Sequence, residues 1–191
     1  MELKDRLHRL NLWSQKFKTE RIILMKKAMI YLLLITLVIS FAGCSKSEGS
    51  ANESKNIEGD LKDILKEIYD TADLTEDFKQ YSLDRLQTID INVDNCEYYL
   101  GKQGLEFQEA IASSPLMTTT AYELDLVRVK EGADIEQIKT EIKENVNPRK
   151  WICVGVDPKN VIVDSIGDII VVILSDDNAT ALHNAFLKLK D

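Results

Sequence analysis

Residues 161–174 read VIVDSIGDIIVVIL, which is the clearest β-sheet signal in the chain. Its two halves, Val161–Ile166 and Ile169–Leu174, are short apolar runs rich in β-branched residues, and Gly167-Asp168 between them is typical of a hairpin turn. The second half is apolar at every position, whereas a strand with one face in water would alternate with polar residues. We therefore expect an antiparallel hairpin whose second strand is covered on both faces.

Two segments upstream of the hairpin are expected to be strands of the same sheet. Residues 151–156 are almost continuously apolar, like the second half of the hairpin. Residues 122–130 alternate instead, which places Glu123 and Asp125 on the face opposite to Leu124. The alternation changes phase at Leu126-Val127, where a β-bulge would keep both apolar sets inward.

Four segments have the spacing of amphipathic helices, in which apolar residues recur three and four positions apart. The clearest begins at Asp60, and the second, around Phe78, is weaker. The positions expected on the apolar faces of the four helices are Leu61, Ile64, Leu65, Ile68; Phe78, Tyr81, Leu86; Ile135, Ile138, Ile142; and Ala179, Leu182, Phe186, Leu189.

The ends of two helices can be predicted from capping residues. Asp134 is followed three positions later by Gln137, as in a capping box, and Asp176 or Asp177 is expected to cap the last helix. Residues 105–114 fit either a helix or irregular chain, which Pro115 would end in both cases.

The order of these elements predicts one α+β domain over residues 60–191, with a mainly antiparallel sheet and packed helices. The apolar strands need cover on their second face. The protein's own helices are the simpler source of that cover. A partner protein, a second copy or an apolar ligand is the alternative, since exposed apolar patches usually mark interaction sites.

Charge is distributed unevenly along the 191 residues. The first 43 residues hold eight Lys/Arg and three Asp/Glu; because the whole chain holds 24 and 32, the remainder holds 16 and 29, a net charge of −13. Nucleic-acid binding depends on clustered basic residues, so the acidic remainder argues against it. A basic start before an acidic body suggests a targeting segment before a domain.

Residues 28–42 form a short apolar segment directly after Lys26 and Lys27. As a helix they would span about 22 Å, less than the ~30 Å hydrocarbon core of a bilayer. A basic start, a short apolar run and small residues at its end are typical of a cleaved signal peptide, here over residues 25–43. The sequence Phe41-Ala42-Gly43-Cys44 resembles the lipobox of bacterial lipoproteins, with Phe41 in place of the usual leucine.

The lipobox resemblance implies that the Cys44 sulfur carries a diacylglycerol and that the signal is cut between Gly43 and Cys44. Two acyl chains hold a protein stably at a bilayer, so the mature protein is expected on the extracytoplasmic face of the cell membrane. An uncut signal anchor with Cys44 as an ordinary thiol is the alternative.

The segments on either side of the signal differ in character. Residues 1–24 are expected to be an upstream extension before a true start at Met25, with a cytosolic amphipathic arm as the alternative. Residues 44–59 are polar, with no large apolar side chain before Ile57, and are expected to form a flexible tether.

Three tracts carry a resemblance to a known family: AYELDLVRVK at residues 121–130 with EGAD and a helix after it, the hairpin of residues 161–174, and the closing helix to Phe186. They resemble small Gram-positive lipoproteins with an uncharacterised C-terminal domain, the domain of unknown function four-three-five-eight. The resemblance covers about half to two thirds of the chain and rests on apolar patterns. It implies the lipid-anchored location and no reaction, substrate or catalytic residue.

Few residues suit catalysis or metal binding. His183 has no suitable partner four residues away on its helix and is expected to be a boundary histidine. Cys96 and Cys153 are expected to be buried free thiols, with a disulfide between them as the alternative. Residues 90–95 space three oxygen-bearing side chains as a calcium loop does, but the twelfth position is Gly101, so we expect a strand or turn.

These observations favour a non-catalytic lipoprotein that binds a protein partner or itself through the apolar sheet face. The alternative is a hydrolase of envelope or wall polymers that uses two carboxylates among Glu106, Glu109, Asp164 and Asp168. Carboxylates are abundant in any acidic protein, so their spacing alone selects no catalytic pair. We expect no cofactor, no metal and no catalytic residue.

Overall fold

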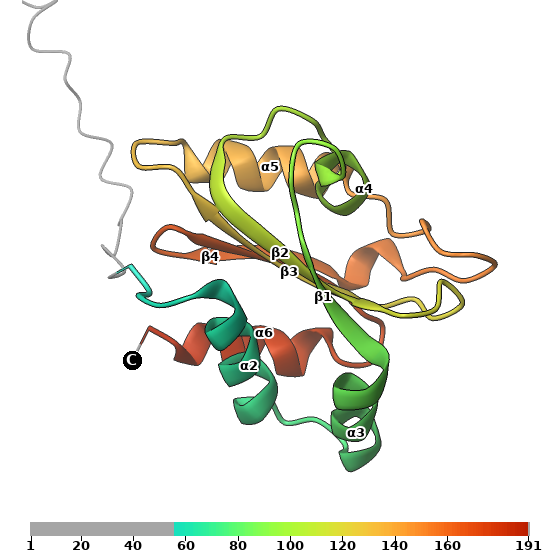
Figure 1. Cartoon of the computed structure of the whole chain (residues 1–191). Coiled ribbons are helices and arrows are strands. Elements are labelled where there is room, and N and C mark those ends of the chain that lie inside the picture. The colour runs from blue at the N-terminus through green and yellow to red at the C-terminus, as the bar shows by residue number, and fades with distance from the viewer. Residues whose placement is uncertain (1–55, 191) are drawn as a thin grey trace, which may run out of the picture. The chain divides into compact units, whose positions relative to one another are not determined.

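The computed structural model describes residues 56–190, which lie in one compact unit (Figure 1). The expected upstream extension, the signal peptide and Cys44 lie outside the described residues, as does most of the expected tether. The helices are α2 (Leu61–Thr71), α3 (Glu76–Arg85), α4 (Cys96–Leu100), α5 (Ile135–Asn145) and α6 (Ala179–Lys188), with a 3₁₀ turn, η1 (Pro158–Asn160). The strands are β1 (Leu86–Asp90), β2 (Phe107–Pro115), β3 (Glu123–Val129), β4 (Val161–Ile166) and β5 (Ile169–Leu174).

The five strands form one sheet in the order β1-β2-β3-β5-β4, and every pair is antiparallel. The predicted hairpin is present, because Ile166 pairs with Ile169 across the Gly167-Asp168 turn. The predicted α+β class is confirmed. The strand order places β5, a late element in the chain, between β3 and β4.

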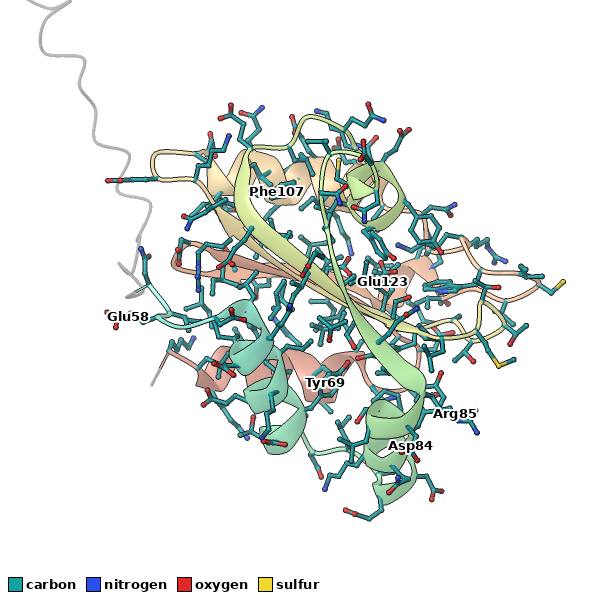
Figure 2. All side chains as sticks on the ribbon, in the orientation of Figure 1. Glu58, Tyr69, Asp84, Arg85, Phe107 and Glu123 are labelled. Atoms are coloured by element: carbon teal, nitrogen blue, oxygen red, sulfur yellow. The ribbon has the colours of Figure 1, made fainter. Side chains whose placement is uncertain are left out.

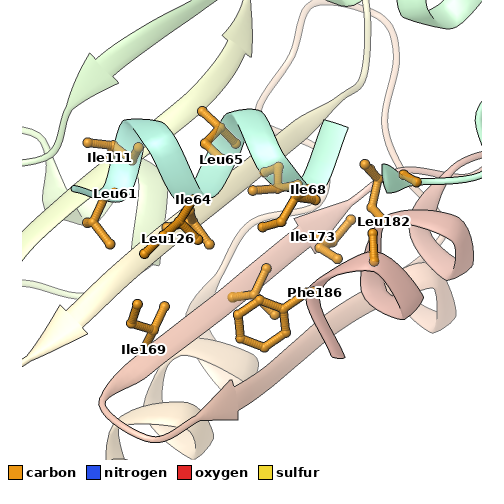
Figure 3. Close-up of a cluster of buried hydrophobic side chains, with 14 of the residues drawn as sticks. Leu61, Ile64, Leu65, Ile68, Ile111, Leu126, Ile169, Ile173, Leu182 and Phe186 are labelled. Atoms are coloured by element: carbon orange, nitrogen blue, oxygen red, sulfur yellow. The ribbon is translucent and has the colours of Figure 1, made fainter. Parts of the chain in front are cut away.

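Helices cover both faces of the sheet, as Figure 1 shows: α2 and α6 lie on one face, and α4 and α5 lie on the other. Every residue of β5 is therefore buried, and its side chains are divided between two cores. The first core includes Ile173 with Leu182 and Phe186 of α6 (Figure 3). The second includes Val172 with Ile142 of α5. The protein's own helices thus provide the cover that β5 needs, and this strand offers no apolar face to a partner.

Two expectations about the strands are wrong. Residues 107–115 form strand β2 rather than a helix or irregular chain. The second half of β2 is buried on both faces and is built of small residues such as Ala110 and Ala112, so it lacks the alternation that marks a strand. The irregularity in the β2–β3 ladder lies between Phe107 and Glu109, not at Leu126-Val127, because both faces of β3 are covered and need no bulge.

Residues 151–156 were expected to be a strand but form an irregular loop. The strand that they could join, β5, already pairs with β3 on one edge and β4 on the other. Trp151 is buried, whereas Ile152 and Val154 are exposed and Cys153 has a positive φ of 60°. The apolar character of this segment therefore does not reflect a place in the sheet.

The helix starts agree only in part with the capping prediction. Asp134 caps α5, and its Oδ1 accepts a hydrogen bond from the Gln137 amide at 3.0 Å. The residue at the start of α6 is Asn178, whose amide donates to Ser175 Oγ at 3.1 Å. Asp176 instead accepts a hydrogen bond from the amide of Asp157, so its carboxylate ties the loop before β4 to the loop before α6.

Replacing Asp134 by alanine is expected to cost about 1 kcal/mol of unfolding free energy, since the first turn of α5 loses its side-chain acceptor. The matched Asp177→Ala change is expected to stay within about 0.5 kcal/mol, because this exposed carboxylate does not cap α6. Urea unfolding of both variants measures the difference. Equal losses would contradict the assignment of the two caps.

Candidate functional site

Two carboxylates are buried on β3, the central strand of the sheet. Glu123 and Asp125 lie two residues apart on β3, and both have 0% exposure. The sequence places them opposite Leu124, as observed, but that face is not solvent-exposed. It is covered by α4, by α5 and by the loop that follows α5.

Lys150 supplies the positive charge that faces these carboxylates. Its ammonium forms a short ion pair with Glu123, and its side chain is only 3% exposed. The same nitrogen donates to the backbone carbonyl oxygens of Tyr98, at 2.9 Å, and Tyr99, at 3.3 Å. Lys150 therefore connects the loop after α5 both to β3 and to α4.

Aromatic rings complete the surroundings of the ammonium group. Lys150 Nζ lies 4.9 Å from the ring centroid of Tyr98, 5.4 Å from that of Tyr99 and 5.8 Å from that of Trp151. Contacts within about 6 Å of an aromatic face are attractive for a cation. We call the set formed by Glu123, Asp125, Lys150, Tyr98, Tyr99 and Trp151 the Lys150 cluster.

The charges of the Lys150 cluster do not balance when both carboxylates are ionised. Burial raises the pKa of Glu123 to about 6, although Lys150 opposes the rise. Burial, and then the negative charge of Glu123, raises the pKa of Asp125 well above its ordinary value. When both carboxylates are ionised, one oxygen of Glu123, both oxygens of Asp125 and the indole nitrogen of Trp151 are buried without a hydrogen-bond partner, whereas a protonated Asp125 can donate to Glu123. The arrangement can therefore hold a proton at neutral pH.

An exposed apolar surface lies beside the Lys150 cluster. It is formed by Leu116 and Met117 in the β2–β3 loop, Ile152 and Val154 in the loop after α5, and Tyr98 of α4, and we call it the tip surface. The two loops meet where the amide of Ile152 donates to the carbonyl of Thr118 at 2.9 Å. Both loops project from the same end of the sheet in Figure 1, and Figure 2 labels Glu123 close to that end.

His183 has a partner that the sequence did not reveal. Its Nε2 lies 2.8 Å from Asp164 Oδ2 on the edge strand β4, and Lys139 Nζ lies 3.4 Å from the other oxygen. Burial alone would raise the pKa of Asp164, but the hydrogen bonds from His183 and the Ser165 amide, with the charge of Lys139, lower it. Asp164 thus joins side chains from helices on both faces of the sheet, and the contact is structural.

Of the other three carboxylates named as candidates for hydrolysis, the structure brings Glu109 and Asp168 together around one arginine, and Glu106 lies apart from them. Glu109 and Asp168 both contact the Arg128 guanidinium, at 2.5 Å and 3.4 Å. Glu106 is exposed on the chain just before β2. Arg128 also donates to the carbonyl of Gly59 at 2.8 Å, so this group fixes the entry of the chain into the domain.

A second polar group lies in the first core. The hydroxyl of Tyr69 is 2.6 Å from that of Tyr122 and 2.8 Å from Ser113 Oγ. Burial raises the pKa of Tyr69 to about 12 and that of Tyr122 well above its ordinary value. Both phenols are therefore neutral, and they connect α2 to the sheet by hydrogen bonds.

The remaining candidates have structural roles. Cys96 and Cys153 are both unpaired, but Cys153 is exposed rather than buried, because its loop is not a strand. In residues 90–95 the side chains of Asn92 and Asn95 accept backbone hydrogen bonds and close a turn, as expected. Among the described residues, no group of three or more His, Cys, Asp or Glu side chains is placed to hold a metal ion.

The chain matches no family model, no curated protein and no solved structure. The resemblance to Gram-positive lipoproteins therefore stays a prediction. Within residues 56–190, no helix has the length and apolar character needed to cross a bilayer.

The alternation of residues 122–130 places Glu123 and Asp125 on one face of the strand but does not by itself reveal that this face is buried. The sequence of β5 does indicate the burial, because β5 is apolar at every position and a strand paired to it is covered on both faces as well. Carboxylates in such a strand need a buried cation. The sequence separation of 27 residues between Glu123 and Lys150, however, gives no sign of which cation is used.

Proposed function

We propose that this protein is a lipid-anchored extracytoplasmic lipoprotein that works as a non-catalytic binding module, with the tip surface as its contact for a protein partner. The anchor is the diacylglycerol on Cys44, after cleavage between Gly43 and Cys44. The observation that carries the proposal is the gathering of exposed apolar side chains. Of the seven large apolar residues exposed on the described chain, five belong to the tip surface.

The charge of the tip surface supports a protein partner with an apolar face. The loop of residues 116–122 has no charged residue, and residues 146–156 contain Arg149 and Lys150 but no acidic residue. The chain after the signal is otherwise strongly acidic, so the tip surface is where an approaching protein meets least negative charge. Exposed apolar side chains that gather on neighbouring loops are typical of an interaction site.

The place where the chain enters the domain supports the same function. Ile57 packs against the first core, and Arg128 holds its carbonyl and that of Gly59 near the β4–β5 turn. The β3–β5 register puts Arg128 next to Ile169, whereas the tip loops adjoin the other end of this ladder, where Glu123 pairs with Leu174. A tether that enters at one end leaves the tip surface at the opposite end open to a partner.

A photo-crosslinking amino acid placed at Met117 or Ile152 in the full chain is expected to capture one and the same protein on intact cells. At Glu131, which is exposed in the turn after β3 at the end of the β3–β5 ladder opposite to the tip loops, the same probe is expected to capture none. Mass spectrometry of the crosslinked bands identifies the product. Equal capture from all three positions, or no capture from the two tip positions, would contradict the binding proposal.

The anchor is tested in the same cells. A labelled fatty acid is expected to mark the wild-type chain and not Cys44→Ser, and the Cys44→Ser chain is expected to leave the membrane fraction or to keep its signal. Unchanged labelling of Cys44→Ser would overturn the lipid assignment, whatever the crosslinking gives.

A further inference from the structure

We infer that the Glu123–Asp125 pair is a proton-controlled clamp on the loop of residues 147–157, so that the loop is held firmly in mild acid and loosens as the pair loses protons. This loop carries Ile152 and Val154 of the tip surface. The inference concerns the regulation of the proposed binding site and rests on the proposed function only for its biological consequence.

The loop depends on the buried cluster for its position. It has no strand pairing, and the amide of Ile152 bonds across to Thr118. The hydrogen bond from Val156 to Pro148 stays within the loop, and its last residue is held by Asp176. Val156 packs into the second core near the end of the loop, whereas Lys150 and Trp151, which precede the exposed Ile152 and Val154, enter the domain at the Lys150 cluster.

The groups that face the two carboxylates come from every layer around them. Lys150 approaches from the loop, and the phenols of Tyr98 and Tyr99 approach from α4. Beside Asp125, β2 and β5 contribute only Ala112 and Val172, its partners in the ladder. The α5 residues in this core are apolar, and the phenols of Tyr69 and Tyr122 lie in the core on the other face. One buried ammonium therefore faces two carboxylates.

The direction of the pH effect depends on whether the two carboxylates bind protons more tightly in the closed loop or in the open loop. In the closed loop, burial raises the pKa of Glu123 from 4.5 to about 6 and that of Asp125 well above 3.8. Opening admits water and returns both pKa values toward their ordinary range. Protons thus favour the closed loop, and closure weakens as the pH rises from about 4.5 through 6 and beyond.

Protonation of Glu123 does not leave the ammonium without partners. Lys150 keeps the carbonyl oxygens of Tyr98 and Tyr99 and the three aromatic rings, and a protonated carboxyl still accepts its hydrogen bond. Asp125 has no cation of its own. Its ionised carboxylate is therefore stabilised most when the loop opens to water at higher pH. Binding through the tip surface is then weaker or stronger at neutral pH according to whether the partner fits the closed or the open loop.

Hydrogen–deuterium exchange of residues 150–156 in the full chain tests the clamp without any partner. After correction for the intrinsic pH dependence of exchange, the opening constant is expected to rise with pH, by roughly fifteenfold between pH 4.5 and 7.5 from the shift of Glu123 alone. Asp125→Asn is expected to reduce this rise, and the combination of Glu123→Gln with Asp125→Asn to abolish it. Asp164→Asn, a matched change on β4, is expected to retain it in full.

A pH-independent opening constant in the wild-type chain would overturn the clamp, as would an equal rise in the double variant and the wild type. If the double variant does not fold, the comparison of Asp125→Asn with Asp164→Asn decides the same question. The exchange measurement is independent of the crosslinking on cells, so the clamp and the proposed binding function can fail separately.

Discussion

Replacing Lys150 by methionine is expected to lower the free energy of unfolding by about 3–5 kcal/mol at pH 7, because Glu123 then stays buried without a cation. Methionine fills a similar volume, so the loss reports the missing charge and hydrogen bonds rather than a cavity. The loss is expected to shrink at pH 5, where Glu123, with its raised pKa, takes up a proton. Urea unfolding at the two pH values measures both effects.

Lys159 provides the matched control. It pairs with Asp157, but its side chain is 75% exposed, so Lys159→Met is expected to leave the free energy of unfolding nearly unchanged. Adding Glu123→Gln to Lys150→Met is expected to recover part of the loss, since the amide carries no charge. Similar small losses for the two lysines would show that Lys150 is not a buried cation.

Replacing Leu182 by alanine is expected to cost about 2–5 kcal/mol, because Leu182 is fully buried between α6 and the sheet. Figure 3 shows it beside Ile173 and Phe186, the side chains that would border the cavity. The loss combines the lost transfer free energy of the leucine side chain with the cost of the space left behind. Thermal and urea unfolding of the variant give the value.

Leu83→Ala makes the same chemical change on another helix. Leu83 is mostly exposed on α3, so this variant is expected to unfold within about 0.5 kcal/mol of the wild type. A loss at Leu83 as large as that at Leu182 would contradict the burial of the two leucines and the assignment of the first core.

The elements that the sequence predicted well are those whose signal is local. The β4–β5 hairpin carries its own turn, α2 carries an apolar stripe, and the start of α5 carries its own acceptor, Asp134. Each of these depends on residues within a few positions of one another, so it can be predicted without knowing the tertiary contacts.

The features that the sequence did not predict depend on contacts between distant parts of the chain. Strand β2 is recognisable only beside β3, because its small residues fit between two covered faces. Residues 151–156 resemble a strand, but the sheet has no free edge for them next to β5. The Lys150 cluster joins β3, α4 and a loop, so its members are brought together by the completed fold. Competition for sheet positions and long-range charge pairing are not encoded in local periodicity.

The position of β5 in the sheet also has a consequence for biosynthesis. This strand lies between β3 and β4 and contributes side chains to both cores, and α6 follows it in the chain. A nascent polypeptide that has emerged only as far as α5 lacks the central strand on which both cores depend, so cooperative folding must await the final segments. In the exported lipoprotein that we propose, this late completion of the cores would keep the chain from becoming compact while it is still being made.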